Sequence, residues 1–182
     1  MATLIAQRIR QFLAREPGLS EGAFTYLYER HLDRILNYVR YRLGPEEAED
    51  ATADVFVRAW GRRRGYDSEK GTPTTWLWAI ARNVVTDRLR RRRLRQVELS
   101  LDLAVSTDPL ADIERQEEWR RVQVALGYLP TVDQEIIALR FGAGHTNRAI
   151  AGLMEMSEAN VAQRLRRALR KLRTQLQGDD ML

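Results

Sequence analysis

The chain has no cysteine, little histidine and no long apolar run. The absence of cysteine among 182 residues excludes disulfides, thiolate metal sites and cysteine nucleophiles, and it fits a reducing compartment. His31 and His145 are the only histidines, so there is little material for a metal cluster or a serine-type triad. No apolar stretch approaches the roughly 18 residues that span a bilayer. We therefore expect a soluble globular protein with no metal, no cofactor and no membrane insertion.

What the chain does have is charge, and it is arranged in blocks. The formal net charge is +5, which indicates an anionic partner such as nucleic acid or a membrane surface. Residues 61–95 and 158–173 are strongly basic, whereas residues 96–118 contain seven acidic side chains and only Arg115. The acidic stretch also contains Ser, Thr and Pro109. Such a composition is typical of a linker between two basic modules.

The apolar residues recur at steps of three and four, which predicts helices and no strands. One apolar face runs through residues 24–43, a second through 48–60 and a third through 72–89, and residues 4–15 add a short amphipathic segment. Shorter helical patterns follow over residues 119–176. The predicted fold class is all-α, with two small helical domains joined by a flexible acidic linker. We expect an N-terminal extension (1–21), a first domain (22–95), the linker (96–117), a second domain (118–177) and a tail (178–182).

The last two helical patterns have the spacing of a helix-turn-helix. Thr146 can cap a short helix and Ser157 a longer basic one, with Glu155 in the turn where a left-handed residue would cost roughly 1 kcal/mol. A solvated basic face is the alternative interpretation of the second helix. The short helix before it favours reading of the DNA major groove instead. The candidate DNA-reading residues are Asn160, Gln163, Arg164, Arg166 and Arg167.

The first domain carries a second basic surface. Arginines crowd the end of its third helix, which suits a phosphate backbone. The loop before that helix mixes arginine with Tyr66, and aromatic rings among guanidinium groups suit unstacked bases. The spacing of Trp60 and Trp76 places both in the core, whereas Trp78 is expected to project away from the apolar face. The candidates for this surface are Arg62, Arg63, Arg64, Tyr66, Trp78, Arg82, Asn83, Arg90 and Arg91.

The second helix of the first domain carries a charged stripe opposite its apolar face. The stripe consists of Glu47, Asp50, Asp54 and Arg58. Because acidic side chains cannot favour DNA, this face is either plain solvated surface or a contact for a basic protein.

Together these patterns resemble the bacterial RNA polymerase sigma factors of the extracytoplasmic-function (ECF) group, within the sigma-70 family. The carrying motifs are AEDATADVFVRAW for region 2.2, TTWLWAIARNVVTDRLRRRRLR for regions 2.3 and 2.4, and residues 126–173 for region 4. Residues 22–95 thus resemble sigma region 2 and residues 118–177 sigma region 4. Ala53, Asn160 and Ala162 depart from the residues common in the family, so no promoter sequence can be transferred from relatives.

The resemblance implies a cytoplasmic, non-enzymatic initiation factor with two kinds of partner. Core RNA polymerase would be bound through the clamp helices of its largest subunit, by Glu47, Asp50, Asp54 and Arg58, and through its flap. Promoter DNA would be bound at a minus-ten element by region 2, which captures unstacked bases, and at a minus-thirty-five element by region 4. Whether an anti-sigma factor also binds stays open.

Two other functions compete with this one. A stand-alone helix-turn-helix regulator would leave the acidic stripe and the arginine cluster without a joint purpose. A nuclease or nucleotidyltransferase would need carboxylates gathered around magnesium in a cleft, whereas Glu46 to Asp54 follow an exposed helix face.

Overall fold

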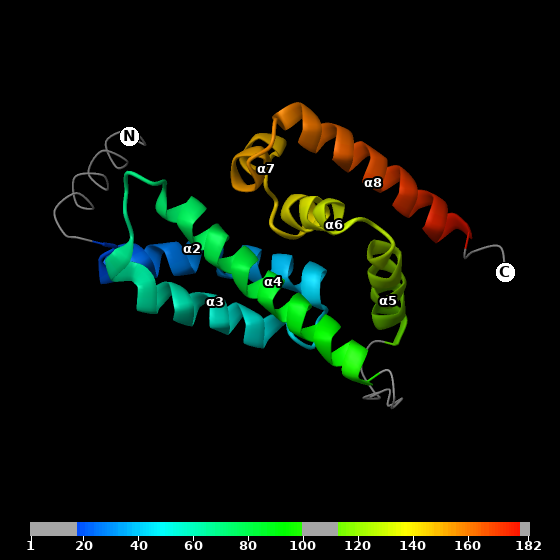
Figure 1. Ribbon diagram of the computed structural model, residues 1–182, viewed down its shortest axis with the longest axis horizontal. Helices are drawn as coiled ribbons and strands as arrows, with labels where there is room; N and C mark the ends of the chain where they lie inside the picture. The colour runs from blue at the N-terminus through cyan, green and yellow to red at the C-terminus, as the bar shows by residue number, and fades with distance from the viewer. Residues whose placement is uncertain (1–17, 100–112, 179–182) are drawn as a thin grey trace.

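The computed structural model describes residues 18–99 and 113–178, and every regular element in these two ranges is a helix (Figure 1). The predicted all-α fold class is confirmed. The amphipathic segment at 4–15, residues 100–112 of the expected linker and the tail from 179 onward lie outside the described residues. The elements are α2 (Glu21–Leu43), α3 (Ala48–Arg62), η1 (Arg63–Gly65), α4 (Pro73–Leu99), α5 (Ile113–Gly127), α6 (Thr131–Ile137), η2 (Ala138–Gly142), α7 (Asn147–Met154) and α8 (Glu158–Gly178).

Local residue chemistry sets several of the helix ends. The Ser20 hydroxyl accepts the Ala23 amide at the start of α2, and Gly44, with φ of 95°, ends that helix. The Thr146 hydroxyl caps α7 in the same way through the Ala149 amide. Glu155, the residue after α7, has φ 54° and ψ 44°, so the predicted left-handed residue in the helix-turn-helix is present.

Helices α2, α3 and α4 form the N-terminal domain. They pack through buried aliphatic side chains such as Ile35, Val39, Val55, Leu77 and Val84, each of which has no exposed surface. These residues occupy the predicted apolar faces of the three helices, so hydrophobic burial accounts for the bundle.

The C-terminal domain consists of α5, α6, η2, α7 and α8. Its core includes Ile136, Leu139, Ile150, Val161 and Ala168, none of which has any exposed surface. Helix α8 packs on α5, α6 and α7, and Figure 1 shows it on the side of the molecule opposite α3.

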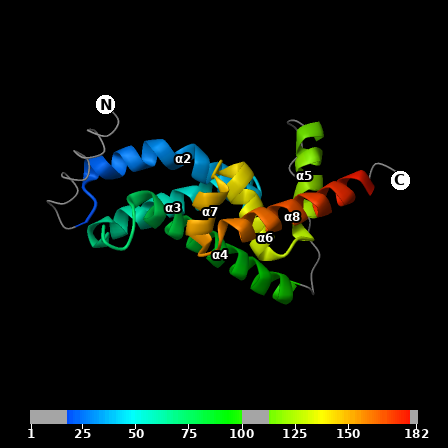
Figure 2. The same ribbon diagram turned by 90° about the horizontal axis from the view of Figure 1, so that it is seen from above.

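The two domains are packed against each other and share one continuous core. Segment η2 lies along α2, and α7 contacts α4, as Figure 2 also shows from above. The approach of η2 to α2 is close because Gly142 has no side chain. A Cβ atom at this position would lie 3.0 Å from the Asn37 carbonyl oxygen, 3.0 Å from the Tyr41 ring and 3.1 Å from the Tyr38 Cα. We call this arrangement, in which the two domains are packed against each other, the closed form, and an arrangement with separated domains the open form.

Candidate protein and nucleic-acid interfaces

The acidic stripe of α3 is partly neutralised by α4. Arg88 of α4 forms ion pairs with Glu47 and Asp54, at 3.5 and 2.5 Å, and Arg58 pairs with Asp87 at 3.4 Å. The Glu47 and Asp54 side chains remain 40% and 46% exposed, and Asp50 is exposed beside them. The ion pairs fix α3 on α4 while the carboxylates stay within reach of a partner.

The predicted DNA-contacting loop is more ordered by its own side chains than the sequence suggested. Tyr66 was expected in the open loop, but it is 8% exposed, packs edge-on against Trp76 and donates its hydroxyl proton to the Gly71 carbonyl at 2.7 Å. Arg62 and Arg64 are exposed. Tyr66 thus holds the loop closed, and the arginines beside it remain the groups open to a ligand.

The exposure of Trp60 and of Trp78 is the reverse of what the sequence predicts. Trp60 was expected in the core, but its ring is 39% exposed and lies under the Arg63 guanidinium, 3.5 Å from the ring centre. The expectation that Trp78 projects away from the apolar face is wrong, because this side chain has no exposed surface. The reason is tertiary: α4 is covered on that side by the C-terminal domain, a contact that helix periodicity does not reveal.

Trp78 lies at the junction of the two domains. Its ring packs edge-on against Tyr38 of α2, with ring centres 5.5 Å apart, and against His145 of the C-terminal domain at 4.5 Å. It also faces His31 of α2, with ring centres 6.4 Å apart. In the closed form no base can reach this ring.

The remaining candidates on α4 divide into covered and exposed residues. Arg82 pairs with Glu135 of α6 at 3.1 Å and donates to the Leu153 carbonyl at the end of α7. Asn83, Arg90 and Arg91 are exposed. The phosphate-binding end of α4 is therefore open in the closed form, whereas Arg82 is engaged by the C-terminal domain.

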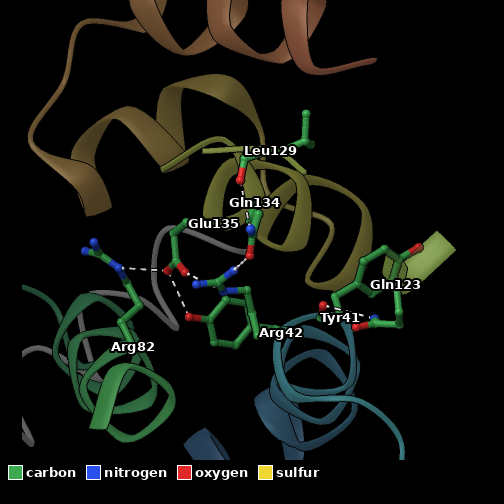
Figure 3. Close-up of polar contacts among 8 residues, drawn as sticks. Tyr41, Arg42, Arg82, Gln123, Leu129, Gln134 and Glu135 are labelled. Atoms are coloured by element: carbon green, nitrogen blue, oxygen red, sulfur yellow. Dashed lines mark hydrogen bonds and ion pairs between the residues drawn. The ribbon is translucent and has the colours of Figure 1, made fainter. Parts of the chain in front are cut away.

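A carboxylate that the sequence analysis did not single out joins the domains. Glu135 is 8% exposed, accepts hydrogen bonds from Tyr38 and Arg82 and forms an ion pair with Arg42, all residues of the N-terminal domain (Figure 3). The Tyr38 hydroxyl donates at 2.8 Å, Arg42 Nε lies 3.0 Å away and Arg82 Nε 3.1 Å away. Burial raises the pKa of Tyr38 well above its usual range, and the Glu135 carboxylate adds to the shift. We call Glu135, Tyr38, Arg42 and Arg82 the Glu135 cluster.

Further polar contacts border the Glu135 cluster. Arg42 also donates to the Gln134 side-chain oxygen at 2.7 Å, and Gln134 in turn donates to the Leu129 carbonyl at 2.9 Å. Gln123 of α5 donates to the Tyr41 carbonyl at 3.2 Å (Figure 3).

The only sequence pattern around Glu135 is DQE followed by two isoleucines. Nothing in this pattern indicates that the Glu135 side chain turns toward the other domain.

The DNA-reading face predicted on α8 is open to solvent. Gln163, Arg166 and Arg167 are exposed and Asn160 is partly so, while Val161 and Ala168 on the opposite face are fully buried. Arg164 differs, because its Nη1 donates to Asp133 of α6 at 2.8 Å. That ion pair holds α8 on its own domain, and Arg164 is therefore less free to meet a base edge than its neighbours.

The C-terminal domain also has an exposed apolar groove between α5 and α8. Val124 of α5 is 55% exposed, Tyr128, the residue after α5, is 69% exposed, and Leu169 of α8 is 41% exposed. A pocket of about 440 Å³ lies there. Its lining combines apolar and basic groups: Ala125, Tyr128, Leu129, Arg170, Lys171, Thr174 and Gln175.

Comparison with known proteins defines the class. The model of Sigma-70 region 2 matches residues 27–95, and that of Sigma-70 region 4 matches residues 119–172. The two matches together cover more than half of the chain, in the order of a sigma factor. The chain belongs to the sigma-70 family, and its curated relatives place it in the ECF group, whose members direct transcription as alternative sigma factors.

Two relatives illustrate the likeness. The ECF RNA polymerase sigma factor SigK of Mycolicibacterium vanbaalenii is 29% identical over 176 residues, covering 93% of this chain and 90% of the relative. SigK of Mycobacterium tuberculosis is 27% identical over 170 residues, covering 88% and 89%.

Solved structures agree with the fold. CnrH, solved in complex with the cytosolic domain of CnrY, is 26% identical, with a TM-score of 0.64 and coverage of 88% of this chain and 91% of that one. RpoE of Bartonella quintana, solved with the anti-sigma factor NepR, is 20% identical, with a TM-score of 0.62 and coverage of 85% and 96%. Its likeness concerns the fold. Within the described ranges, no helix meets the length and apolarity that a membrane crossing demands.

Proposed function

We propose that this factor acts in the cytoplasm without catalysing a reaction of its own: it binds core RNA polymerase, brings it to promoters with two elements and stabilises the opened strand. The synthesis of RNA belongs to the polymerase. The observation that supports this most directly is the presence of both sigma regions in order, with an acidic face on α3 and an exposed basic face on α8. Run-off transcription with core enzyme on a promoter library tests it. The absence of any factor-dependent transcript would contradict it.

The acidic face of α3 is assigned to the clamp helices of the polymerase. Glu47 and Asp54 keep close to half of their side-chain surface exposed, and Asp50 is exposed. Arg88 restricts the first two and thereby lowers the entropy cost of presenting them to a partner. Arg58 lies at the edge of the same face, bound to Asp87.

Asp50→Arg is the cleanest variant of this face, because Asp50 is exposed, whereas Asp54→Arg would also break the ion pair with Arg88. A like charge at the contact costs several kcal/mol. We expect polymerase affinity to fall about 30-fold or more, measured by fluorescence anisotropy with core enzyme, with an unchanged melting temperature. Glu29→Arg on exposed α2 is the charge-matched control. Equal affinity of the Asp50 variant and the control would refute the assignment.

The DNA surfaces are assigned to the predicted residues, and Trp78 and Arg82 would take part only after the domains separate, because the closed form buries Trp78 and pairs Arg82 with Glu135. The face of α8 with Asn160, Gln163, Arg166 and Arg167 would read the minus-thirty-five element, with Arg164 held in support by Asp133. At the minus-ten element, Arg90 and Arg91 would bind phosphates, Arg62, Arg63 and Arg64 would follow the strand, and Trp78, Arg82 and Asn83 would meet bases. Tyr66, being buried, would shape the loop.

A pair of substitutions separates base reading from phosphate binding. Gln163→Ala should change the base preference at one or two base pairs of the upstream element. The discrimination against the wrong base should fall there by about 1–3 kcal/mol. Arg91→Ala should weaken binding of all sequences alike and reduce the salt dependence by about one counterion. Binding of polymerase holoenzyme to a randomised promoter set, at two salt concentrations, measures both. The same change in sequence preference from both variants would contradict this division.

The groove between α5 and α8 is assigned to the polymerase flap. Its lining combines apolar side chains with Arg170 and Lys171, which suits an apolar helix that carries acidic groups. An anti-sigma factor is proposed as a further partner, because the Bartonella quintana factor was solved with the anti-sigma factor NepR, and CnrH was also solved with a bound protein domain, that of CnrY.

The closed form is proposed as the resting form of the factor. Of the residues that the minus-ten assignment requires, Trp78 is buried and Arg82 is held by Glu135 of the C-terminal domain. The two domains therefore have to separate before region 2 can capture a strand. A stand-alone regulator is not favoured, because such a protein has no use for a complete region 2.

A further inference from the structure

Both histidines of the chain pack against Trp78 at the junction of the two domains. His31 of α2 is 1% exposed, and His145, in the turn between η2 and α7, is 6% exposed. The ring centre of Trp78 lies 6.4 Å from that of His31 and 4.5 Å from that of His145. The two titratable rings thus belong to different domains and meet around one tryptophan only when the domains are closed.

The contact between Arg34 and His145 fixes the protonation state of the imidazole. Arg34 Nε donates to the Ala143 carbonyl at 2.7 Å, and this anchors the guanidinium beside the ring. Arg34 Nη2 lies 3.3 Å from His145 Nδ1. A guanidinium can only donate, so Nδ1 must accept and the ring must be neutral. With its first proton on Nε2, the ring would become a cation on gaining a second proton on Nδ1, and that N–H would point at the Arg34 guanidinium.

The charged side chains that act on the two rings are basic. Arg34 faces both rings from α2, and Arg30 acts on His31 from the same helix. From α4, two neutral groups face His31: the Thr74 hydroxyl, 3.3 Å from Nε2, and the Trp78 ring. On the side of η2, Arg140 donates to the His145 carbonyl. The nearby carboxylate of the interface, Glu135, is occupied by Tyr38, Arg42 and Arg82.

We propose that acidification separates the two domains, because His145, assisted by His31, can take up a proton readily only in the open form. The proposal rests on the closed form being the resting form. Burial, and then the Arg34 charge, lower the pKa of His145 from 6.5 to about 4; burial, Arg34 and Arg30 do the same for His31. Because the pKa of each histidine is lowered in the closed form, the free energy that favours the closed over the open form is largest well above pH 6.5. It decreases as the pH falls through 6.5 toward 4.

One histidine is expected to raise the ratio of open to closed molecules about tenfold on acidification. For a group that changes from a pKa of about 4 to 6.5 on opening, the ratio of open to closed molecules rises roughly tenfold between pH 7.5 and 5.5. His145 supplies this factor, because its ring leaves Trp78 and Arg34 when the domains part. His31 adds less, because Thr74 and the rest of α4 stay beside it within its own domain.

The experiment measures domain separation in the full chain. Because the protein has no cysteine, Ser68→Cys and Thr174→Cys, one exposed position in each domain, can carry a donor and an acceptor dye. Energy transfer is recorded from pH 7.5 to 5.5 for the parent, His145→Gln and Arg34→Gln. The parent should show a rise of at least tenfold in the open to closed ratio. In His145→Gln the ratio should rise less than threefold. The pH response of Arg34→Gln should also be smaller than that of the parent, because the glutamine oxygen can accept from a protonated ring.

The outcomes separate this inference from the closed form itself. Glu135→Arg, which breaks the interface at every pH, gives the reference for open molecules. If the parent at pH 7.5 already matches that reference, the closed form is refuted and the pH response with it. If the parent is closed at pH 7.5 but its ratio is insensitive to pH, or His145→Gln responds as strongly as the parent, only the proton linkage is overturned.

Discussion

Glu135→Arg should separate the two domains of this sigma factor almost completely. The substitution removes the carboxylate that the Tyr38 hydroxyl, Arg42 and Arg82 share, and it adds a further cation to their site. Breaking a buried ion pair by removing one partner costs about 3–5 kcal/mol, which is more than a hundredfold in the closed to open ratio. Small-angle scattering should show a larger radius of gyration, and binding to a forked minus-ten oligonucleotide should become tighter.

Glu135→Gln is the matched control. The amide keeps the size of the side chain and one acceptor oxygen, so we expect an intermediate opening. The fold of the C-terminal domain should survive both changes, because the polar partners of Glu135 lie in the other domain. If Glu135→Arg left both the radius of gyration and oligonucleotide binding at the parent values, the cluster would not hold the domains together.

Gly142→Leu should also open the molecule, through sterics rather than charge. A Cβ atom here would lie 3.0–3.1 Å from atoms of Asn37, Tyr38 and Tyr41, two of them backbone atoms that cannot rotate away. The rest of the leucine side chain would have to displace α2 from η2. Overpacking of this kind costs about 1–3 kcal/mol, so we expect the closed to open ratio to fall about 5- to 150-fold, by the same scattering measurement.

Gly152→Leu makes the same chemical change where there is room. A Cβ atom at Gly152 meets nothing within 4 Å, and leucine is a better helix former than glycine. The domains of this variant should stay closed, and its melting temperature should rise slightly. An equal opening of both variants would show that bulk on the C-terminal domain, and not the contact at Gly142, drives separation.

The sequence was sufficient for the helices, because each depends on its own apolar face and end residues. The left-handed Glu155 and the exposed basic face of α8 could both be predicted from neighbours within a few positions along the chain. The acidic stripe was also correctly placed on the outer side of α3, although its ion pairs with Arg88 and Asp87 depend on α4 and could not be read from spacing.

The errors concern residues whose surroundings come from distant segments. Trp78 lies off the apolar face of α4 as judged within one helix, yet a turn from the other domain covers it. Tyr66 lies in a loop, yet its ring and hydroxyl find partners at Trp76 and Gly71. Glu135 had no local signal of importance, because its partners are nearly a hundred positions upstream or on α4.

The exposure of α8 has a consequence for how the resting factor searches the genome. The closed form keeps Trp78 and Arg82 at the domain interface but leaves Gln163, Arg166 and Arg167 exposed. A molecule in this shape could still probe intact double helix at upstream elements while being unable to melt anything downstream. The step that commits a promoter to opening would then be uncoupled from the step that finds it.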